Sequence, residues 1–341
     1  MSAASQPGPP FSGTMRAIGC AGFGDPSVLQ VMERPVPGIG AADVLVRVAA
    51  AGVNRPDATQ RRGLYPPPPG VTDIPGLDIA GEVVACGAEV REWRIGDEVC
   101  ALVPGGGYAE YAAAPAATCL PVPAGLEMRS AAALPEVCFT AWAKLMEAGR
   151  LARRESVLIQ GGTSGVGLAA IQMAKALRDA RVIVTASTAE KRAQAEAFGA
   201  DAAIDYGADD WPDQVRQANF GHGVDVILDA QGGDYVPREL ELLSTGGRLV
   251  LLGAHRGVES TINVRDLIRR RLSIVGSVIR GRSLAEKHAI ARSLLENVWP
   301  LLARGAMRIP VQATFPLERA EDAHWMLERN EQAGKIVLEV G

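Results

Sequence analysis

The chain has 341 residues, of which 48% are hydrophobic, and its formal net charge is −4. A chain of this length can bury more than one large core, so two domains are expected. The acidic balance argues against a nucleic-acid partner, whose binding usually needs a basic face. The apolar runs are too short to cross a bilayer, and residues 1–13 lack the basic and apolar regions of a signal peptide. We expect a cytoplasmic protein without membrane contact, with residues 1–13 as a flexible extension.

Cysteine and histidine form no metal-binding or disulfide pattern. The number of cysteines is odd and no C-x-x-C occurs, which argues against a disulfide framework and against a structural zinc site. The histidines are scattered along the chain, so they predict no metal-binding helix. We expect most cysteines to be ordinary buried thiols; they are Cys20, Cys86, Cys100, Cys119 and Cys138.

The first part of the chain, residues 14–123, is predicted to be rich in β-strands. Val44–Val48 and Gly81–Val84 have the β-branched composition of strands. Tyr65–Gly70 contains four consecutive prolines, which permit neither a helix nor an inner strand. An extended loop is therefore expected there.

From Ser130 onward, short apolar runs alternate with helical periodicity, which predicts βαβ units. The fold class is therefore α/β, with a doubly wound parallel sheet. Ser283 and Glu286 fit a capping box that opens a long helix to about Ala303, and another helix is expected over 317–330. The strands are expected at 156–160, 181–186, 202–204, 224–229, 248–253 and 272–279, with a last strand at 335–340.

A glycine-rich turn between a strand and a helix is the most informative motif. Glycine lets the backbone turn tightly and approach a pyrophosphate without a Cβ in the way. The helix start then offers free N–H groups and a positive dipole end to the anion. Ser164 is expected to contact the pyrophosphate, to cap the helix, or to do both. The predicted dinucleotide loop comprises Gly162, Thr163, Ser164, Gly165, Val166 and Gly167.

The end of the second strand indicates which dinucleotide binds. NAD sites usually carry an acidic residue here that accepts from the ribose hydroxyls. This chain has Ser187 instead, and Lys191 one turn into the next helix is placed to reach a 2′-phosphate. The pattern favours NADPH. The alternative is that Lys191 and Arg192 form a solvated helix face paired with Glu190 and Glu196.

Five stretches resemble a known family. The order of a β-rich domain, a Rossmann domain and a return segment resembles the medium-chain dehydrogenase/reductase superfamily. More narrowly, the chain resembles the zinc-independent quinone oxidoreductases related to zeta-crystallin. The resemblance implies a GroES-like catalytic domain of residues 14–130 and 283–341, and a Rossmann domain of residues 131–282. It is carried by Val53–Asp57, Arg62–Pro68, Pro75–Gly81, Val103–Tyr111 and Ala132–Glu136.

Comparison with the zinc-containing branch of the same superfamily implies that catalytic zinc is absent. The zinc ligands of that branch correspond to about Val53, Leu77 and Glu136 in this chain. A catalytic zinc needs three protein ligands of nitrogen, sulfur or oxygen type. One carboxylate cannot hold the ion.

The resemblance also implies roles for individual residues. Asn54 and Tyr65 are expected beside the nicotinamide, where Tyr65 would hydrogen-bond or stack on a flat acceptor. Tyr65 as a loop anchor and Glu136 as a buried structural carboxylate are the alternatives, and Asp229 is expected to be structural. Further cofactor or site contacts are implied for Thr140, Ser187, Lys191, Tyr206 and Gly253.

The expected activity is hydride transfer from NADPH to a small quinone. A reductase of enones or enoyl thioesters is the second possibility, because fold does not fix substrate. An NADPH- or RNA-binding protein without relevant turnover is the third. The apolar strand expected at 272–279 is a candidate edge for pairing with a second copy, so a homodimer is predicted.

Overall fold

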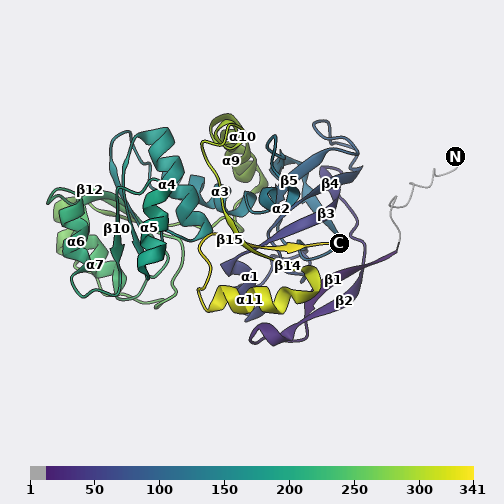
Figure 1. The fold of residues 1–341 in the computed structure, drawn as a ribbon, viewed down its shortest axis with the longest axis horizontal. Helices are drawn as coiled ribbons and strands as arrows, with labels where there is room; N and C mark the ends of the chain where they lie inside the picture. The colour runs from purple at the N-terminus through teal and green to yellow at the C-terminus, as the bar shows by residue number, and fades with distance from the viewer. Residues whose placement is uncertain (1–12) are drawn as a thin grey trace. The chain divides into compact units, whose positions relative to one another are not determined.

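The computed structural model describes residues 13–341, so residues 1–12 of the expected extension lie outside the described part. The chain folds into two compact units (Figure 1). The first unit contains the described residues up to Glu136, with 283–292 and 310–341, and the second contains 137–282 and 293–309. In the described part, no helix is long and apolar enough to span a bilayer.

These boundaries differ from the expected ones in two places. Residues 131–136 lie with the first unit, where the backbone N–H of Glu136 is 3.4 Å from Asp78 Oδ2. Residues 293–309 lie with the second unit, where Arg308 and Gln172 exchange two hydrogen bonds of 2.8 and 2.9 Å. Both segments make side-chain-to-backbone hydrogen bonds with residues far away in the chain.

The first unit is built on a mainly antiparallel sheet. Its strands follow the order β14-β15-β3-β4-β5-β7, with β6 also paired to β3, while β1 and β2 form a separate ribbon. The strands are β1 (Thr14–Cys20), β2 (Leu29–Pro35), β3 (Asp43–Val53), β4 (Asp78–Cys86), β5 (Glu98–Leu102), β6 (Tyr111–Pro115), β7 (Cys119–Pro121), β14 (Val311–Pro316) and β15 (Lys335–Glu339). The helices assigned to it are α1 (Arg55–Arg61), α2 (Met128–Ala131), the start of α9 (Leu284–Asn297) and α11 (Ala320–Glu328).

The second unit is a parallel sheet with the strand order β10-β9-β8-β11-β12-β13. This is the doubly wound order expected for a Rossmann domain. From β8 the chain adds strands first on one side of the sheet, β9 and β10, and then on the other side, β11 to β13, while all strands stay parallel. The strands are β8 (Ser156–Ile159), β9 (Arg181–Ala186), β10 (Ala202–Asp205), β11 (Val224–Asp229), β12 (Leu243–Leu251) and β13 (Ser273–Gly276). The helices are α3 (Pro135–Trp142), α4 (Gly165–Arg178), α5 (Ala189–Ala197), α6 (Trp211–Ala218), α7 (Tyr235–Leu242), α8 (Val264–Arg270) and α10 (Trp299–Ala303), and a π-helical turn covers Ala143–Ala148.

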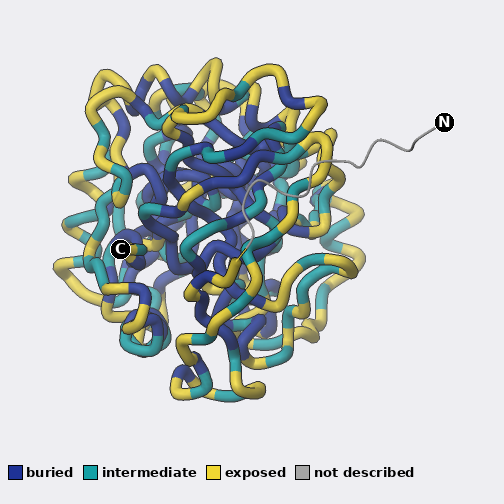
Figure 2. Tube along the Cα trace, turned by 90° about the vertical axis from the view of Figure 1, so that its right-hand side faces the viewer, coloured by how far each residue is buried: buried dark blue, intermediate teal, exposed yellow. Residues whose placement is uncertain are grey.

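The central strands of this sheet are apolar and buried, as helices on both faces of a parallel sheet require. Leu158, Ile183 and Ile227 are 0% exposed. Figure 2 shows such buried segments in the interior and exposed segments along the outer loops. Residues 65–70 form neither a helix nor a strand, as predicted, and the capping box of Ser283 with Glu286 is confirmed.

Two predictions about element lengths are wrong. The long helix expected to run to about Ala303 is two helices, because Pro300 lacks the N–H that a continuous helix needs and instead lies in the first turn of α10. The strand expected at 272–279 is only β13 (Ser273–Gly276), which ends opposite Leu251, the last residue of β12, and the N–H of Ser277 makes one further hydrogen bond to the Leu251 carbonyl over 3.0 Å.

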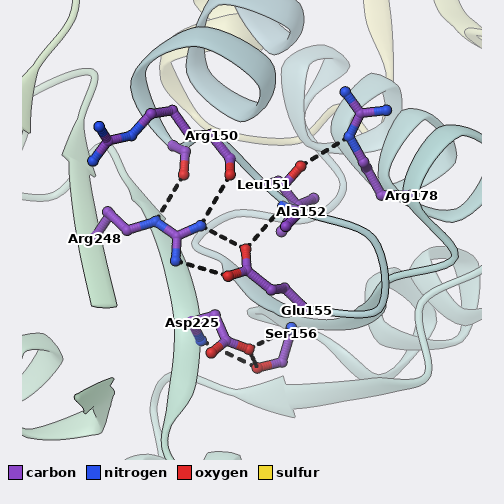
Figure 3. Close-up of polar contacts among 9 residues, drawn as sticks. Arg150, Leu151, Ala152, Glu155, Ser156, Arg178, Asp225 and Arg248 are labelled. Atoms are coloured by element: carbon purple, nitrogen blue, oxygen red, sulfur yellow. Dashed lines mark hydrogen bonds and ion pairs between the residues drawn. The ribbon is translucent and has the colours of Figure 1, made fainter. Parts of the chain in front are cut away.

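Polar side chains fix the amino-terminal edge of the parallel sheet (Figure 3). Arg248 on β12 donates to Glu155, just before β8, over 2.5 and 3.0 Å, and to the carbonyl of Gly149 over 2.9 Å. Asp225 on β11 accepts from the backbone N–H and the hydroxyl of Ser156 over 2.8 and 2.7 Å. The network joins β8, β11 and β12 at the edge opposite the glycine-rich loop.

Candidate active site

The glycine-rich loop lies where the sequence predicts it, between β8 and α4. Ser164 caps α4: its hydroxyl accepts from the N–H of Gly167 over 3.0 Å and donates to the carbonyl of Gly161 over 2.9 Å. The helix start beyond it presents N–H groups that need an outside partner. Helix capping by Ser164 is therefore confirmed, and its contact with a pyrophosphate stays a prediction.

Two loop positions accept no side chain. A Cβ on Gly162 would lie 2.6 Å from the Cβ of Val184, and a Cβ on Gly167 would lie 2.5 Å from the carbonyl oxygen of Gly161. Both distances are shorter than any tolerated contact. Glycine is therefore required for close packing of the loop on β9 and of α4 on the loop, as in dinucleotide-binding loops.

The ion pair at the end of β9 differs from the one that the alternative interpretation of Lys191 and Arg192 implied. Arg192 pairs with Asp205 over 2.8 Å rather than with Glu190 or Glu196, and its Nη1 also lies 3.3 Å from the carbonyl of Ser187. Lys191 lies in the first turn of α5, which Thr188 caps over 3.2 Å. The start of α5 after Ser187 therefore carries the cations Lys191 and Arg192 together with the carboxylate of Glu190, and Asp205 adds a second carboxylate through its pair with Arg192.

The parallel strands bring most of the predicted cofactor residues to one edge. β8, β9, β10 and β12 all run in the same direction, so the residues that follow them lie at their common carboxyl-terminal edge. Ligands of open parallel sheets bind at this edge. Thr140, on α3 of the same unit, is 7% exposed. The residues at the edge are those of the 162–167 loop together with Ser187, Lys191, Tyr206 and Gly253.

In the first unit, Asn54 lies at the centre of a buried polar cluster. It is 5% exposed and precedes α1. Its Nδ2 donates to Asp78 Oδ1 over 2.7 Å, and its Oδ1 accepts from Lys335 Nζ over 2.5 Å. Donor and acceptor ends of the Asn54 amide are both held by the protein, so the cluster fixes how this side chain is oriented.

A second buried network adjoins the first. Asp57 accepts from the N–H of Asn54 over 2.8 Å and from the hydroxyl of Tyr108 over 3.1 Å. Burial, followed by the repulsion of Asp78, raises the pKa of Asp57 to about 7. The Tyr108 hydroxyl is also 3.1 Å from His324 Nε2, and burial lowers the pKa of His324 to about 3. The backbone at Asn54 is thus held by a carboxyl group that titrates near neutral pH.

Tyr65 lies half-buried in the proline-rich loop after α1, and Leu64 beside it is 74% exposed. Tyr65 and Asn54 belong to the first unit, whereas Thr140 and the cofactor residues belong to the second. The structure therefore places the predicted acceptor residues directly before α1 and in the loop that follows it.

The positions that correspond to zinc ligands do not fit the metal. Val53 and Leu77 are buried apolar side chains, 3% and 5% exposed. In residues 13–341, no group of three or more His, Cys, Asp or Glu side chains is arranged to hold a metal ion. Zinc sites need such nitrogen, sulfur or oxygen ligands.

Two family models match the chain. The alcohol dehydrogenase GroES-like domain matches residues 40–124, and the zinc-binding dehydrogenase model matches residues 165–296. Quinone oxidoreductase of Lama guanicoe is 34% identical over 95% of this chain and 97% of its own length, and that of Rattus norvegicus is 32% identical with the same coverage. The chain belongs to the quinone oxidoreductase family of medium-chain dehydrogenases/reductases.

Solved structures agree with the family. A mycobacterial protein complexed with NADPH is 30% identical, with a TM-score of 0.84 over 95% of this chain and 99% of its own. An NAD-dependent alcohol dehydrogenase is 33% identical, also with a TM-score of 0.84, over 96% of this chain and 100% of its own. A much longer protein, from the phenolphthiocerol/phthiocerol polyketide synthase of Mycobacterium tuberculosis, is 31% identical over 87% of this chain and 13% of its own length.

As a quinone oxidoreductase family member, the chain is an oxidoreductase with a nicotinamide cofactor. The nicotinamide supplies the hydride when it is bound, and the protein binds, orients and excludes water. The glycine-rich loop and the edge residues of the second unit fit such a cofactor, because two loop glycines admit no Cβ and the α4 start offers N–H groups.

Sequence reasoning did not single out several residues that organise the site. Lys335 and Gln160 could have been recognised as buried polar residues, since each lies in or beside an apolar strand. Such residues need buried partners. The sequence gives no such indication for Tyr108, His324 and Glu239, because their partners lie far along the chain.

Proposed function

We propose that this protein reduces a small quinone by hydride transfer from NADPH, without a zinc ion. The proposal is carried by one combination: an intact dinucleotide loop together with apolar side chains at Val53 and Leu77, where zinc enzymes of the superfamily place ligands. The near full-length relatives named quinone oxidoreductases support it.

A quinone suits a site without a Lewis acid. The acceptor is electron-poor, and the oxygen that gains negative charge on reduction takes its proton from water. The protein then acts mainly by binding and orientation. Tyr65 would donate a hydrogen bond from its hydroxyl to the acceptor carbonyl, and Asn54 would set the shape of the site through its fixed amide.

NADPH is proposed over NADH because of the charges around Ser187. No carboxylate occupies position 187 to accept from the ribose hydroxyls, and Lys191 and Arg192 follow in the first turn of α5. Glu190 and Asp205 are the opposing charges, and Arg192 forms an ion pair with Asp205. The likeness to an NAD-dependent alcohol dehydrogenase makes the comparison of both cofactors necessary.

The test is a steady-state assay of cofactor oxidation, followed by the nicotinamide absorbance band. It compares NADPH with NADH, and an ortho-quinone, a para-quinone, an enone and crotonyl-CoA, each with and without a chelator. Fast, NADPH-selective and chelator-resistant quinone reduction is expected. Loss of activity with the chelator would contradict the zinc-free mechanism.

Enoyl thioester reduction is the second candidate, and one observation favours it. Part of a polyketide synthase is 31% identical to most of this chain. Faster turnover of crotonyl-CoA than of either quinone would move the function to alkene reduction. Tight cofactor binding without any turnover, together with a salt-sensitive affinity for RNA, would favour the binding-protein alternative.

A homodimer through β13 is proposed as well. β13 is the edge strand of the second unit's sheet, and Val278 just beyond it is 51% exposed. An open apolar edge favours pairing with another strand. Sedimentation should give twice the mass of one chain, and Val275→Lys should yield monomers; a wild-type monomer would contradict the proposal. The cytoplasmic location stays a prediction from the sequence.

A further inference from the structure

A chain of buried hydrogen bonds runs from α7 to the glycine-rich loop. Gln160 Nε2 donates to Glu239 Oε1 over 2.8 Å, and the hydroxyl of Thr185 donates to Gln160 Oε1 over 2.6 Å. The N–H of Gly161 donates to the same Thr185 hydroxyl over 3.3 Å, and the N–H of Gly162 donates to the Thr185 carbonyl over 2.9 Å. All the donors and acceptors lie within the second unit.

The orientation of the Gln160 amide in this series of hydrogen bonds is set by Glu239. The Gln160 amide has a donor end and an acceptor end, which a rotation of its terminal group would exchange. Glu239 Oε1 accepts, so the NH₂ group faces Glu239 and the carbonyl oxygen faces Thr185. The Thr185 hydroxyl therefore gives its single proton to Gln160 and keeps a lone pair for the N–H of Gly161.

The three hydrogen-bonded side chains are shielded from water. Glu239 and Thr185 are 0% exposed and Gln160 is 7% exposed. Hydrogen bonds in such surroundings are strong, and a broken one leaves a costly unpaired group. Rotation of the Gln160 amide would turn its NH₂ group toward the Thr185 hydroxyl, whose oxygen already accepts from the N–H of Gly161. The proton of that hydroxyl would then lose its acceptor.

Burial raises the pKa of Glu239, and the negative charge of Asp229 raises it further. Asp229 ends β11 and accepts from the N–H groups of Gln231 and Gly232 over 2.5 and 2.7 Å. Burial and the repulsion of Asp229 raise the pKa of Glu239 well above its ordinary value. Glu239 Oε2 has no hydrogen-bond partner in the described part of the chain, which also favours the protonated, uncharged form. With the proton on Oε2, Oε1 remains the acceptor for the Gln160 amide.

We infer that Glu239 is a positioning residue for the nicotinamide cofactor: through Gln160 and Thr185 it holds Gly161 and Gly162 in the geometry that receives the pyrophosphate. Within the described residues, the Glu239 side chain makes no hydrogen bond to the loop; it accepts from Gln160. The inference rests on nicotinamide binding by the family and does not depend on which acceptor is reduced.

The test measures the Kd of NADPH and of NADH by the fluorescence of the bound cofactor, without an acceptor. Glu239→Leu removes the acceptor for Gln160 while filling the same space, and we expect the Kd of both cofactors to rise about tenfold, as for one lost anchoring hydrogen bond. Glu239→Gln keeps an uncharged acceptor and should restore a Kd within about twofold of wild type. The KM of the acceptor should stay unchanged in both variants.

Two further variants keep the test decisive. Glu155→Gln weakens the network of Figure 3 at the opposite edge of the sheet, so it should lower stability without raising the Kd. Thr185→Val removes the hydroxyl between Gln160 and Gly161 and should also raise the Kd of both cofactors. If Glu239→Leu folds, the Kd increases of the two substitutions should be non-additive in the double variant. If Glu239→Leu does not fold, the raised Kd of Thr185→Val tests the inference. Wild-type Kd values in Glu239→Leu and Thr185→Val, or a rise in Glu155→Gln that matches its loss of stability, would overturn the inference.

Discussion

Lys335 and Asp78, the first residues of β15 and β4, form an ion pair of 3.2 Å in the interior of the first unit, where their side chains are 4% and 0% exposed. Both strands pair with β3, whose last residue Val53 precedes Asn54. The ion pair and its bonds to Asn54 therefore tie three strands to the start of α1 at the position expected to face the acceptor.

We predict that Lys335→Met lowers the free energy of unfolding by about 3–5 kcal/mol, because it leaves the Asp78 carboxylate buried without its partner. Urea unfolding of the holoprotein at neutral pH measures the change. The matched control is Arg47→Met, whose exposed pair with Glu82 joins β3 to β4 and should contribute less than about 1 kcal/mol. Equal losses of unfolding free energy in the two variants would contradict the prediction that the buried pair stabilises the protein more than the exposed one.

Local patterns in the sequence were sufficient for most of the fold. Alternating apolar runs and helical periodicity located the six parallel strands, and the glycine-rich turn located the carboxyl edge at which the cofactor residues gather. The helix break at Pro300 was missed because the apolar periodicity continues through it. Proline is a stronger determinant there than the pattern.

The buried polar networks could not be predicted from the sequence. Lys335 and Asn54 are 281 residues apart, and Gln160 and Glu239 are 79 apart. Nothing in the neighbourhood of either residue specifies its partner, because the pairing exists only after the sheets have formed. A polar residue in an apolar strand indicates that a partner is needed but does not identify it.

His324 predicts how stability changes on the acid side. Burial lowers its pKa to about 3, so the folded protein keeps the imidazole neutral while the unfolded chain takes up a proton below its ordinary pKa. The stabilising contribution is complete above the unfolded pKa of about 6.5 and is lost as the pH falls toward 3. Between about pH 6.5 and pH 5 the loss should be about 2 kcal/mol relative to His324→Gln.

The measurement is urea unfolding of wild type and His324→Gln at both pH values. Asp57 changes stability in the opposite sense over this range, since its raised pKa makes the folded state less favourable as the pH rises, but it is present in both proteins and cancels in the comparison. His288→Gln, at an exposed histidine, should follow wild type. Parallel curves for wild type and His324→Gln would contradict the assignment.

Lys191→Ala should separate the two nicotinamide cofactors. Loss of a cation beside Ser187 removes an interaction with the 2′-phosphate, which only NADPH carries, so the KM for NADPH should rise about tenfold and that for NADH less than about twofold. Arg216→Ala removes a cation from α6, whose last turn lies toward the other edge of the sheet, and should change neither value. Equal changes for NADPH and NADH in Lys191→Ala would remove Lys191 from the 2′-phosphate site.

Tyr65→Phe tests the acceptor side of the proposed reaction. The substitution keeps the ring in the proline-rich loop and removes only the hydroxyl, so a hydrogen bond to the acceptor carbonyl is lost while loop packing is kept. We expect kcat/KM for the quinone to fall about tenfold, with the Kd of NADPH unchanged, because the cofactor residues lie in the other unit. Tyr111→Phe, on β6 of the same unit, provides the matched loss of a tyrosine hydroxyl and should leave kcat/KM near the wild-type value. If both variants keep full quinone turnover, Tyr65 anchors its loop and the hydrogen bond to the acceptor must come from another group.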